Sequence, residues 1–328
     1  MQTLTFEQIK SIVHGAARVE LNNGEICLER FTKEQQELYK KVSPNDFYIK
    51  TFATAGITLE FETESENLFL SVSVSRGSSR TFFTHSIFVD GVKIGELSGD
   101  IKDKEKDYFQ KNFFLPSGMK KVKILFPWSV CSRIVSMQLD NNAQIIPIKK
   151  KCNILMLGDS ITQGYDAMIP ENAYAIQLSS SLNAEAINKG IAGEQFFPAL
   201  SKLADDFKPD LITVAYGTND WRHSTQERFE KNCTEFFKNL RNTYPNVKII
   251  AFTPVWRVDI NEPQEFGKSL KFISNFIKNI AKTVENMEII DCIDFIPHDA
   301  EFYQTDGVHP IDAGFLHYGK NLLNNIII

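Results

Sequence analysis

The arrangement of apolar residues changes once along this 328-residue chain, near the lysine-rich connector 148–151, and this change constrains the fold more than any other feature. Between about residues 47 and 146, short runs alternate apolar and polar side chains, as strands with one buried face do. After the connector, compact apolar runs alternate with segments of helical spacing, which is typical of a parallel sheet covered by helices. We therefore predict an all-β sandwich domain, similar to a jelly roll, over residues 1–148 and an α/β domain over residues 149–328.

Turn residues divide the predicted β domain into strands. Asn23-Gly24 and Asp90-Gly91 suit backbone positions with positive φ, so each predicts a hairpin. Thr32 precedes a short helical pattern at residues 33–39 and is expected to cap it. Strands are predicted at 18–21, 26–30, 57–63, 68–75, 122–127 and 134–139, and a hairpin with its turn at Asp90-Gly91 is predicted over 87–95.

The α/β domain is expected to place its functional residues at one edge of its sheet. Strands are predicted at 153–157, 185–188, 210–216, 248–252 and 288–291, and helices at 171–183, 196–207, 224–243 and 265–286, with a last helix after Pro310. Ligand sites in such folds lie at the carboxyl ends of the strands. The loops that follow the strands are therefore the first place to look for chemistry.

Ser160 follows the first of these strands, two residues after Gly158. A serine at the point where a buried strand turns into a helix has an exposed hydroxyl, and the helix N-terminus beside it favours negative charge. A nucleophile in acyl transfer needs this environment, because the attacked carbonyl becomes an oxyanion there. The structural alternative is an ordinary helix N-cap.

His309 and Asp306 lie together in the loop after the last strand. A neutral imidazole can take the proton of the serine hydroxyl, and a carboxylate three residues earlier can fold back onto the other ring nitrogen. Pro310 suits the first position of a helix and fixes the loop. The alternative interpretation is a turn aspartate beside a surface histidine.

The remaining two loops offer hydrogen-bond donors for an oxyanion. Gly193 lacks a Cβ, so its N–H can approach a ligand closely, and Asn219 carries a neutral amide. Together with the Ser160 N–H they would form a three-donor oxyanion hole. Gly190 competes with Gly193 for this role, and a loop glycine and a turn asparagine are the structural alternatives.

The motifs at 158–161, Gly193, 217–220 and 306–310 resemble, in order and spacing, the four blocks of the SGNH (GDSL-type) hydrolase superfamily over roughly residues 152–328. The resemblance implies a flavodoxin-like three-layer α/β/α fold. It also implies a Ser160 nucleophile, a His309 base oriented by Asp306, and oxyanion donors at Ser160, Gly193 and Asn219. The two-domain arrangement is similar to that of carbohydrate esterases with an N-terminal β-sandwich, such as family 2 acetylesterases.

Three aromatic residues near strand ends are candidates for substrate contact. Tyr165, Trp221 and Trp256 could stack on a sugar or line an acyl pocket, and core packing is the alternative for each. The strand-end loop 76–83 of the β domain could also reach the cleft. Acidic residues and one histidine gather late in the chain in a spacing that fits no standard metal site, so no metal and no cofactor are predicted: Asp291, Asp294, His298 and Asp299.

Composition limits the partners and the compartment. With 36 basic and 41 acidic residues the net charge is −5, which gives no reason to expect nucleic acid or an anionic membrane as partner. Five cysteines without a Cys-x-x-Cys pair favour reduced thiols. The amino-terminal segment does not resemble a signal peptide and no run is long enough to cross a bilayer, so we expect a cytoplasmic protein.

The sequence thus predicts a serine esterase that removes a small acyl group, acetyl above all, from a carbohydrate or similar alcohol. The same residues would serve an acyltransferase, a thioesterase or a lipid acylhydrolase. The sequence shows no long apolar lid segment, which disfavours long-chain lipids as substrates. A third hypothesis is a glycan-binding module whose hydrolase domain is inactive. Oligomeric state and natural substrate stay open.

Overall fold

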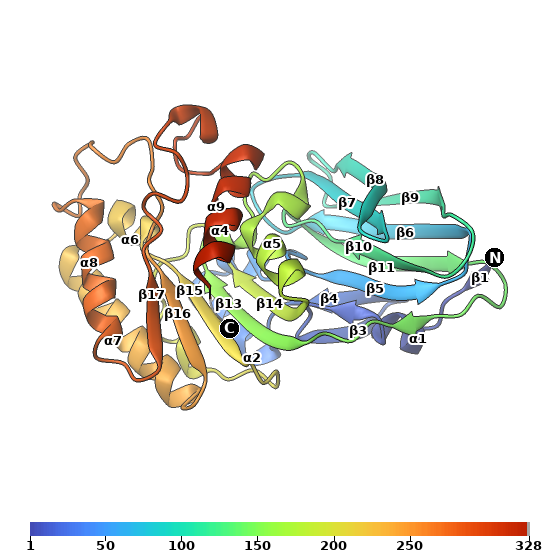
Figure 1. Ribbon diagram of the computed structural model, residues 1–328, viewed down its shortest axis with the longest axis horizontal. Helices are drawn as coiled ribbons and strands as arrows, with labels where there is room; N and C mark the ends of the chain where they lie inside the picture. Colours follow the sequence, from blue (N-terminus) through green and yellow to red (C-terminus); the bar gives the residue numbers. More distant parts are fainter. Residues whose placement is uncertain (327–328) are drawn as a thin grey trace.

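Two antiparallel sheets form most of the amino-terminal half in the computed structural model, which describes residues 1–326. The first sheet has the order β3 (Arg18–Asn22), β4 (Glu25–Glu29), β11 (Val130–Leu139), β6 (Asn67–Arg76) and β9 (Lys106–Phe114), with β1 (Gln2–Thr3) beside β11. The second has the order β12 (Ile146–Pro147), β5 (Thr58–Thr63), β10 (Lys120–Leu125), β7 (Phe82–Val89) and β8 (Val92–Asp100), with β2 (Val13–His14) beside β5. The predicted all-β region is therefore confirmed (Figure 1).

The alternating sequence pattern explains how these two sheets pack. The apolar side chains of β6 and β10 point inward and meet in one hydrophobic core, with Leu70, Val72 and Ile124 fully buried. The predicted hairpin turns adopt positive φ, at 50° and 80° for Asn23 and Gly24. Strand β9 was not predicted, because it is a largely exposed edge strand with few inward apolar residues.

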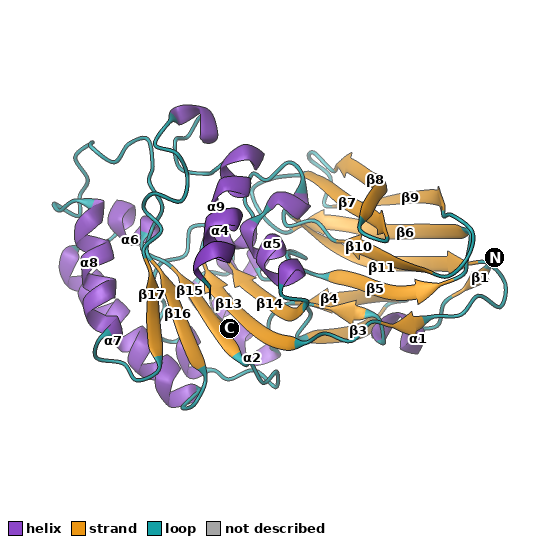
Figure 2. Cartoon of the chain, viewed as in Figure 1, coloured by secondary structure: helices purple, strands orange, loops and turns teal. Residues whose placement is uncertain are grey.

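A five-stranded parallel sheet forms the second half of the chain. Its order is β14 (Ala184–Gly190), β13 (Cys152–Gly158), β15 (Leu211–Ala215), β16 (Lys248–Phe252) and β17 (Met287–Ile290). This is the flavodoxin-like order 2-1-3-4-5, and all five predicted strands are confirmed. Helices α5 (Tyr174–Ser181) and α9 (Asp312–Asn325) pack on one face, and α7 (Gln226–Thr243) and α8 (Leu270–Ala281) on the other, giving three layers (Figure 2).

The prediction of a helix at 196–207 was wrong. This segment contains only the 3₁₀ turn η2 (Leu200–Lys202), and helix α2 (Lys33–Val42) of the amino-terminal half packs against it. The Tyr39 ring lies 5.6 Å from that of Phe197, and the Gln35 amide donates to the Leu203 carbonyl at 3.3 Å. The helical spacing at 196–207 therefore reflects packing against a helix from elsewhere in the chain. The helix predicted at 265–286 is also shorter than expected, since α8 covers 270–281.

The remaining elements are short. They are α1 (Phe6–Lys10), α3 (Phe47–Lys50), α4 (Ser160–Gln163), α6 (Thr218–His223), η1 (Pro170–Asn172) and η3 (Ala300–Phe302). The predicted cap of α2 is confirmed, because Thr32 and Gln35 exchange side-chain hydrogen bonds with each other's backbone N–H.

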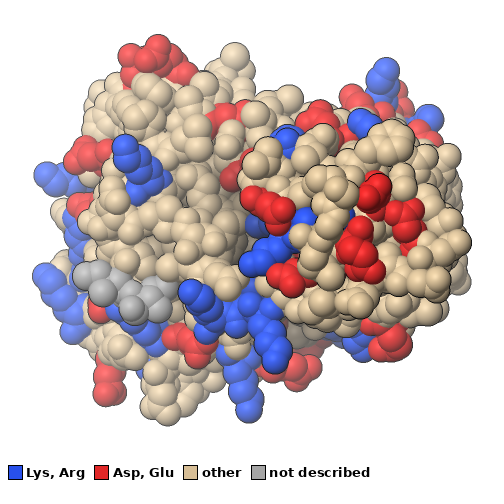
Figure 3. All heavy atoms as spheres, turned by 45° about the vertical axis from the view of Figure 1, so that its right-hand side comes forward, with Lys and Arg blue, Asp and Glu red and all other residues tan. Residues whose placement is uncertain are grey.

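Three general properties complete the description. Lys and Arg side chains are interspersed with Asp and Glu on the face drawn in Figure 3. All five cysteines are free thiols. Within residues 1–326, none of the helices combines the length and the hydropathy that a membrane span requires.

Candidate active site

Ser160 lies at the carboxyl end of the central strand β13, at the start of α4. A Cβ on Gly158 would lie 2.0 Å from the Thr162 hydroxyl oxygen, so only glycine permits this tight turn from strand to helix. The Asp159 carboxylate caps α4 by accepting the Ile161 N–H at 3.0 Å. Asp159, rather than Ser160, is therefore the N-cap, and the Ser160 hydroxyl is left for another role.

Ser160, His309 and Asp306 lie in line. The Ser160 Oγ is 2.9 Å from His309 Nε2, and His309 Nδ1 is 2.6 Å from Asp306 Oδ2. A carboxylate only accepts, so Nδ1 donates to it and Nε2 is the acceptor for the serine hydroxyl. Gly307, at φ 69°, makes the turn that folds Asp306 back onto His309. The three residues predicted from separate motifs thus have the geometry of a nucleophile, a base and an orienting acid.

The environment of Asp306 keeps its carboxyl group ionised. Partial burial opposes ionisation, but hydrogen bonds from the His309 ring and from the N–H groups of His309 and Val308 outweigh it. The pKa of Asp306 is held well below its usual range. A permanently negative group therefore faces the imidazole and can stabilise the imidazolium that forms when His309 takes a proton.

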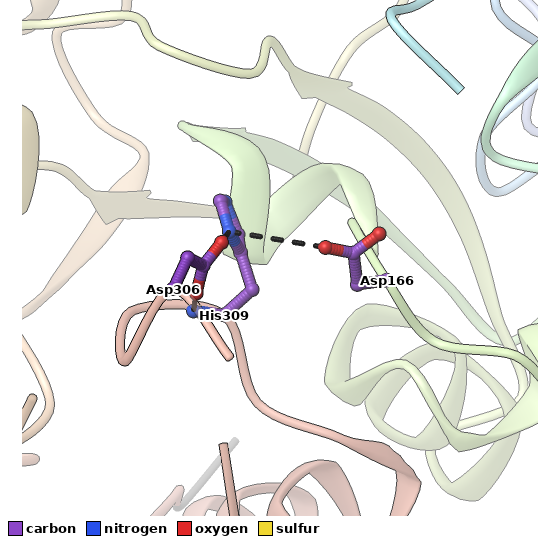
Figure 4. Close-up of side chains that lie close together, drawn as sticks. All are labelled: Asp166, Asp306 and His309. Atoms are coloured by element: carbon purple, nitrogen blue, oxygen red, sulfur yellow. Dashed lines mark hydrogen bonds and ion pairs between the residues drawn. The ribbon is translucent and has the colours of Figure 1, made fainter. Parts of the chain in front are cut away.

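A second carboxylate and an aromatic ring also face His309. Asp166 Oδ2 lies 4.0 Å from His309 Nδ1, on a different loop from Asp306 (Figure 4). The Arg80 guanidinium of the β half binds both oxygens of Asp166 at 2.8 Å, and its ion pair raises the pKa of Arg80. The Tyr165 ring lies 4.8 Å from the His309 ring and also contacts Ser79. The β half therefore reaches the site, as predicted for loop 76–83.

The sequence did not single out Asp166 and Arg80 themselves. Asp166 belongs to no motif. The one feature of the sequence that could have indicated a role for it is its position six residues after Ser160. Arg80 was noted as part of a polar loop, but its partner 86 positions later cannot be found from one sequence. The structure adds one more sign: Asp166 is buried and has φ of 67°, a conformation that non-glycine residues adopt at a cost.

One group of possible metal ligands occurs within the described residues 1–326, namely Asp166, Asp306 and His309. The carboxylate of Asp166 already accepts hydrogen bonds from Arg80, and that of Asp306 accepts from the ring of His309 and from backbone N–H groups. This donor set fits a proton relay. The acidic cluster near the end of the chain is dispersed: Asp291 binds Thr253 and Lys278, Asp299 caps η3, and His298 pairs with Asp294.

Gly193 and Gly190 occupy different environments. Gly193 is exposed, has φ of 88°, and its nearest neighbour to an added Cβ is Phe47 at 3.6 Å. No hydrogen bond within the described chain uses its N–H. Gly190 is buried, its N–H bonds the Asn188 side chain, and an added Cβ would lie 2.3 Å from the Gln163 nitrogen. The geometry thus favours Gly193 as the oxyanion donor and gives Gly190 a packing role.

Asn219 is joined to the Gly193 loop. The side-chain Nδ2 of Asn219 donates to the Glu194 backbone carbonyl at 3.0 Å. The backbone carbonyl of Asn219 accepts from the side-chain amide of Gln195 at 3.1 Å. One of the two Nδ2 hydrogens therefore orients the amide and the other is left for a ligand. The Ser160 N–H, at the first turn of α4, has no acceptor within that helix. These three groups are the candidates for holding an oxyanion.

Three buried carboxyl groups lie beneath the site. Burial raises the pKa of Asp159 and Asp220 to about 7 and that of Glu194 to about 8. The Glu194 carboxyl accepts hydrogen bonds from Tyr39 at 2.5 Å and Tyr216 at 2.7 Å. Tyr39 belongs to α2, so this network also connects the two halves of the chain.

The aromatic candidates have different surroundings. Trp221 is 1% exposed, and its indole N–H donates to the Lys268 carbonyl at 2.8 Å, so no face is open to a substrate. Tyr165 is 5% exposed and supports the His309 ring. Trp256 is half-buried and stacks against His298 at 5.2 Å, which leaves it the candidate with the most accessible surface.

A hollow of about 450 Å³ opens beside Gly193. Both halves of the chain contribute to it, the amino-terminal half through the segment that ends in α3. Its lining combines aromatic rings with basic side chains: Val42, Ser43, Phe47, Gly193, Glu194, Gln195, Phe196, Phe197, His223, Arg228 and Asn232.

The comparisons with known proteins agree with this geometry. Residues 156–315 match the model of the GDSL-like Lipase/Acylhydrolase family, and this match supports an ester hydrolase. The match covers the loops that carry Ser160, Gly193, Asn219, Asp306 and His309. No curated protein matches the sequence.

Several solved structures share the whole two-part fold. The salicylyl-acyltransferase SsfX3 from a tetracycline biosynthetic pathway has a TM-score of 0.79 at 19% identity, covering 94% of this chain and 92% of that one. A family two carbohydrate esterase from Clostridium thermocellum in complex with cellohexaose has a TM-score of 0.64 at 16% identity, covering 84% and 92%. The acetyl xylan esterase Est2A from Butyrivibrio proteoclasticus has a TM-score of 0.64 at 15% identity, covering 99% and 97%. At these identities the likeness concerns the fold.

Proposed function

We propose that the protein is a serine esterase that hydrolyses a small acyl ester, with acetyl as the acyl group, on a carbohydrate. The observation that carries this proposal is the relay from the Ser160 Oγ to His309 Nε2 at 2.9 Å and from His309 Nδ1 to Asp306 at 2.6 Å. Its parts have the distances that general base catalysis requires.

The proposed reaction has two steps. The Ser160 oxygen attacks the ester carbonyl while His309 takes its proton, and the tetrahedral oxyanion is held by the N–H groups of Ser160 and Gly193 and by the Asn219 amide. His309 then gives the proton to the leaving alcohol, which leaves an acyl group on Ser160. Water attacks this ester with His309 again as base, and release of the acid restores the serine.

A carbohydrate is proposed as substrate for two reasons: the fold is similar to that of carbohydrate esterases, and both halves of the chain border the site. Structures that share both halves of this chain include a carbohydrate esterase bound to cellohexaose and an acetyl xylan esterase. In this chain, Arg80 of the β half binds Asp166 beside His309, so both halves border the site. Trp256, in the loop after β16, offers a partly exposed ring of the kind that stacks on sugars.

Acyl transfer is the second candidate, because the structure of a salicylyl-acyltransferase has a TM-score of 0.79 over 94% of this chain. The acyl-enzyme would be the same, and an alcohol would replace water in the second step. Product analysis with an acetyl donor and added sugar separates the two candidates, since a transferase gives the sugar ester and a hydrolase gives acetate. A series of esters with longer acyl chains tests thioesterase and lipid acylhydrolase alternatives in the same way.

The decisive test compares Ser160→Ala with the wild type on p-nitrophenyl acetate and on a panel of acetylated sugars. We expect the variant to lose about 10³-fold or more in kcat while it folds normally, because no other residue supplies the attacking oxygen. Ser224→Ala is the matched control, since its buried hydroxyl has no hydrogen-bond partner within the described chain, and it should keep full activity.

Near-wild-type turnover by Ser160→Ala would reject the proposal. A fluorophosphonate probe adds an independent measurement, because it labels an activated serine. Failure to label the wild type at Ser160, together with binding of glycans, would favour the remaining hypothesis of a binding module with an inactive hydrolase domain.

A further inference from the structure

The segment that leads into the proposed oxyanion turn is held by two cations from the amino-terminal half. The Arg30 guanidinium donates to the carbonyls of Asn188 and Gly190 at 2.6 and 3.0 Å. The Lys50 ammonium donates to the carbonyl of Ala192 at 2.9 Å. Every second carbonyl along residues 188–192 therefore accepts a hydrogen bond from a positive charge, and the last of them belongs to the turn itself.

This turn has a central peptide whose direction matters. The Glu194 N–H bonds the Ile191 carbonyl at 3.1 Å, and φ of 88° at Gly193 is typical of a type II turn. The central peptide unit joins the Ala192 carbonyl to the Gly193 N–H, and these two groups point in opposite directions. Rotation of this unit, as between turn types II and I, would turn the Gly193 N–H away from its present side.

Lys50 is well placed to prevent that rotation. Its side chain is only 12% exposed, its ammonium forms an ion pair with Asp46 at 2.6 Å, and it lies 5.3 Å from the Phe47 ring centre. Its backbone carbonyl accepts from Arg30 at 2.9 Å, which anchors the end of α3. The charge is thus fixed in place, about 4.0 Å from the position of a Cβ on Gly193.

We propose that Lys50 is a positioning residue of the oxyanion hole: its bond to the Ala192 carbonyl holds the Ala192–Gly193 peptide so that the Gly193 N–H faces the developing oxyanion. A charge-assisted hydrogen bond to the carbonyl also polarises the peptide and makes its N–H a better donor. This inference rests on the proposed function. It gives the amino-terminal half a role in the reaction, since Lys50 lies outside the GDSL-like domain.

The test is Lys50→Met, measured by steady-state kinetics on p-nitrophenyl acetate. We expect kcat to fall about tenfold or more with KM changed less than about twofold, because the lost stabilisation belongs to the transition state. The rate of Ser160 labelling by a fluorophosphonate should fall in parallel, since its phosphoryl oxygen needs the same donors. Lys50→Arg keeps a charged donor and should recover part of kcat.

Lys40→Met is the matched control. It removes the same charge from the neighbouring helix, where Lys40 is 54% exposed and pairs with Glu37 at 3.7 Å, and it should leave kcat unchanged. Thermal unfolding and Lys50→Gln separate loss of fold from loss of function. If Lys50→Met and Lys50→Gln are folded and kcat stays within twofold of the wild type, or if only KM rises, the role of Lys50 is overturned while the esterase proposal stands. If the wild type neither hydrolyses esters nor reacts with the probe at Ser160, both proposals are overturned.

Discussion

At the scale of single residues, the strand-end rule located the groups that the structure brings together. Ser160, Asp306 and His309 were each ambiguous alone, yet their places at the ends of strands of one sheet predicted a common site. The sequence left Gly190 as a competitor of Gly193, because both come shortly after the predicted strand 185–188. It depends on burial and on backbone conformation, which only the folded chain shows.

Alanine at each of the two glycines should give opposite phenotypes. Gly190→Ala would place a Cβ 2.3 Å from the Gln163 nitrogen and should destabilise the fold strongly. Gly193→Ala has room, and its positive φ should cost only about 1 kcal/mol of stability. Relief of that strain moves the turn, so we expect at least a tenfold loss of kcat in a folded protein.

Urea unfolding and esterase kinetics on the two variants measure these effects. Gly91→Ala, at a hairpin turn of the β half with φ of 83° and open space around it, is the control for strain alone and should keep full activity. A Gly193→Ala variant with unchanged kcat would remove Gly193 from the oxyanion hole.

At the scale of elements, local patterns predicted the strands well and one helix badly. The strands of the parallel sheet are compact apolar runs whose pattern survives folding. The segment 196–207 has helical spacing, but its apolar residues meet α2, which lies more than 150 positions earlier in the chain. A contact of that separation leaves no mark on a single sequence, and the weakly apolar edge strand β9 was missed because edges bury little.

The buried Glu194 carboxyl, held between Tyr39 of α2 and Tyr216, which follows β15, should make stability depend on pH. Its folded pKa of about 8 lies above the unfolded value of 4.5, so the folded protein keeps a proton that the unfolded chain has lost. Stability from this group is present at low pH and is lost as the pH rises toward 8. Between pH 6 and 8 the free energy of unfolding should fall by about 2 kcal/mol more in the wild type than in Glu194→Gln.

Urea unfolding of both proteins at several pH values measures this difference. Asp159 and Asp220 are present in both proteins, so the difference between the two curves reports Glu194 together with its coupling to these two carboxyl groups. Parallel curves for the wild type and Glu194→Gln would show that Glu194 does not retain its proton on folding.

At the scale of the whole molecule, the predicted division at residues 148 and 149 stays a prediction, although β12 ends at Pro147 and β13 begins at Cys152. The two halves share more than a connector. Phe31 and Tyr39 of the amino-terminal half belong to the hydrophobic core of the α/β half. Arg80 and Lys50 reach the site from the same half. The sequence predicted two fold types, but side-chain contacts between them required the structure.

Arg30 bonds backbone carbonyls of both halves, and its loss should destabilise both halves together. The guanidinium is fully buried and donates to the carbonyls of Ala53 at 2.5 Å, Lys50 at 2.9 Å, Asn188 at 2.6 Å and Gly190 at 3.0 Å. Burial lowers its pKa to about 9, so it remains charged near neutral pH. Arg30→Met would leave buried acceptors without donors. We therefore expect the free energy of unfolding to fall by about 3 kcal/mol or more.

Urea unfolding followed by tryptophan fluorescence and by far-UV circular dichroism measures the effect. Because the halves share a core, we expect one transition for both probes in the wild type, shifted as a whole in Arg30→Met. Arg222→Met is the matched control, since Arg222 is 43% exposed and donates to the side chains of Asp259 and Gln264, and its effect should stay within about 0.5 kcal/mol. Two separate transitions, with only the first half shifted by Arg30→Met, would mean that the parallel sheet does not depend on this arginine and that the halves are stable independently.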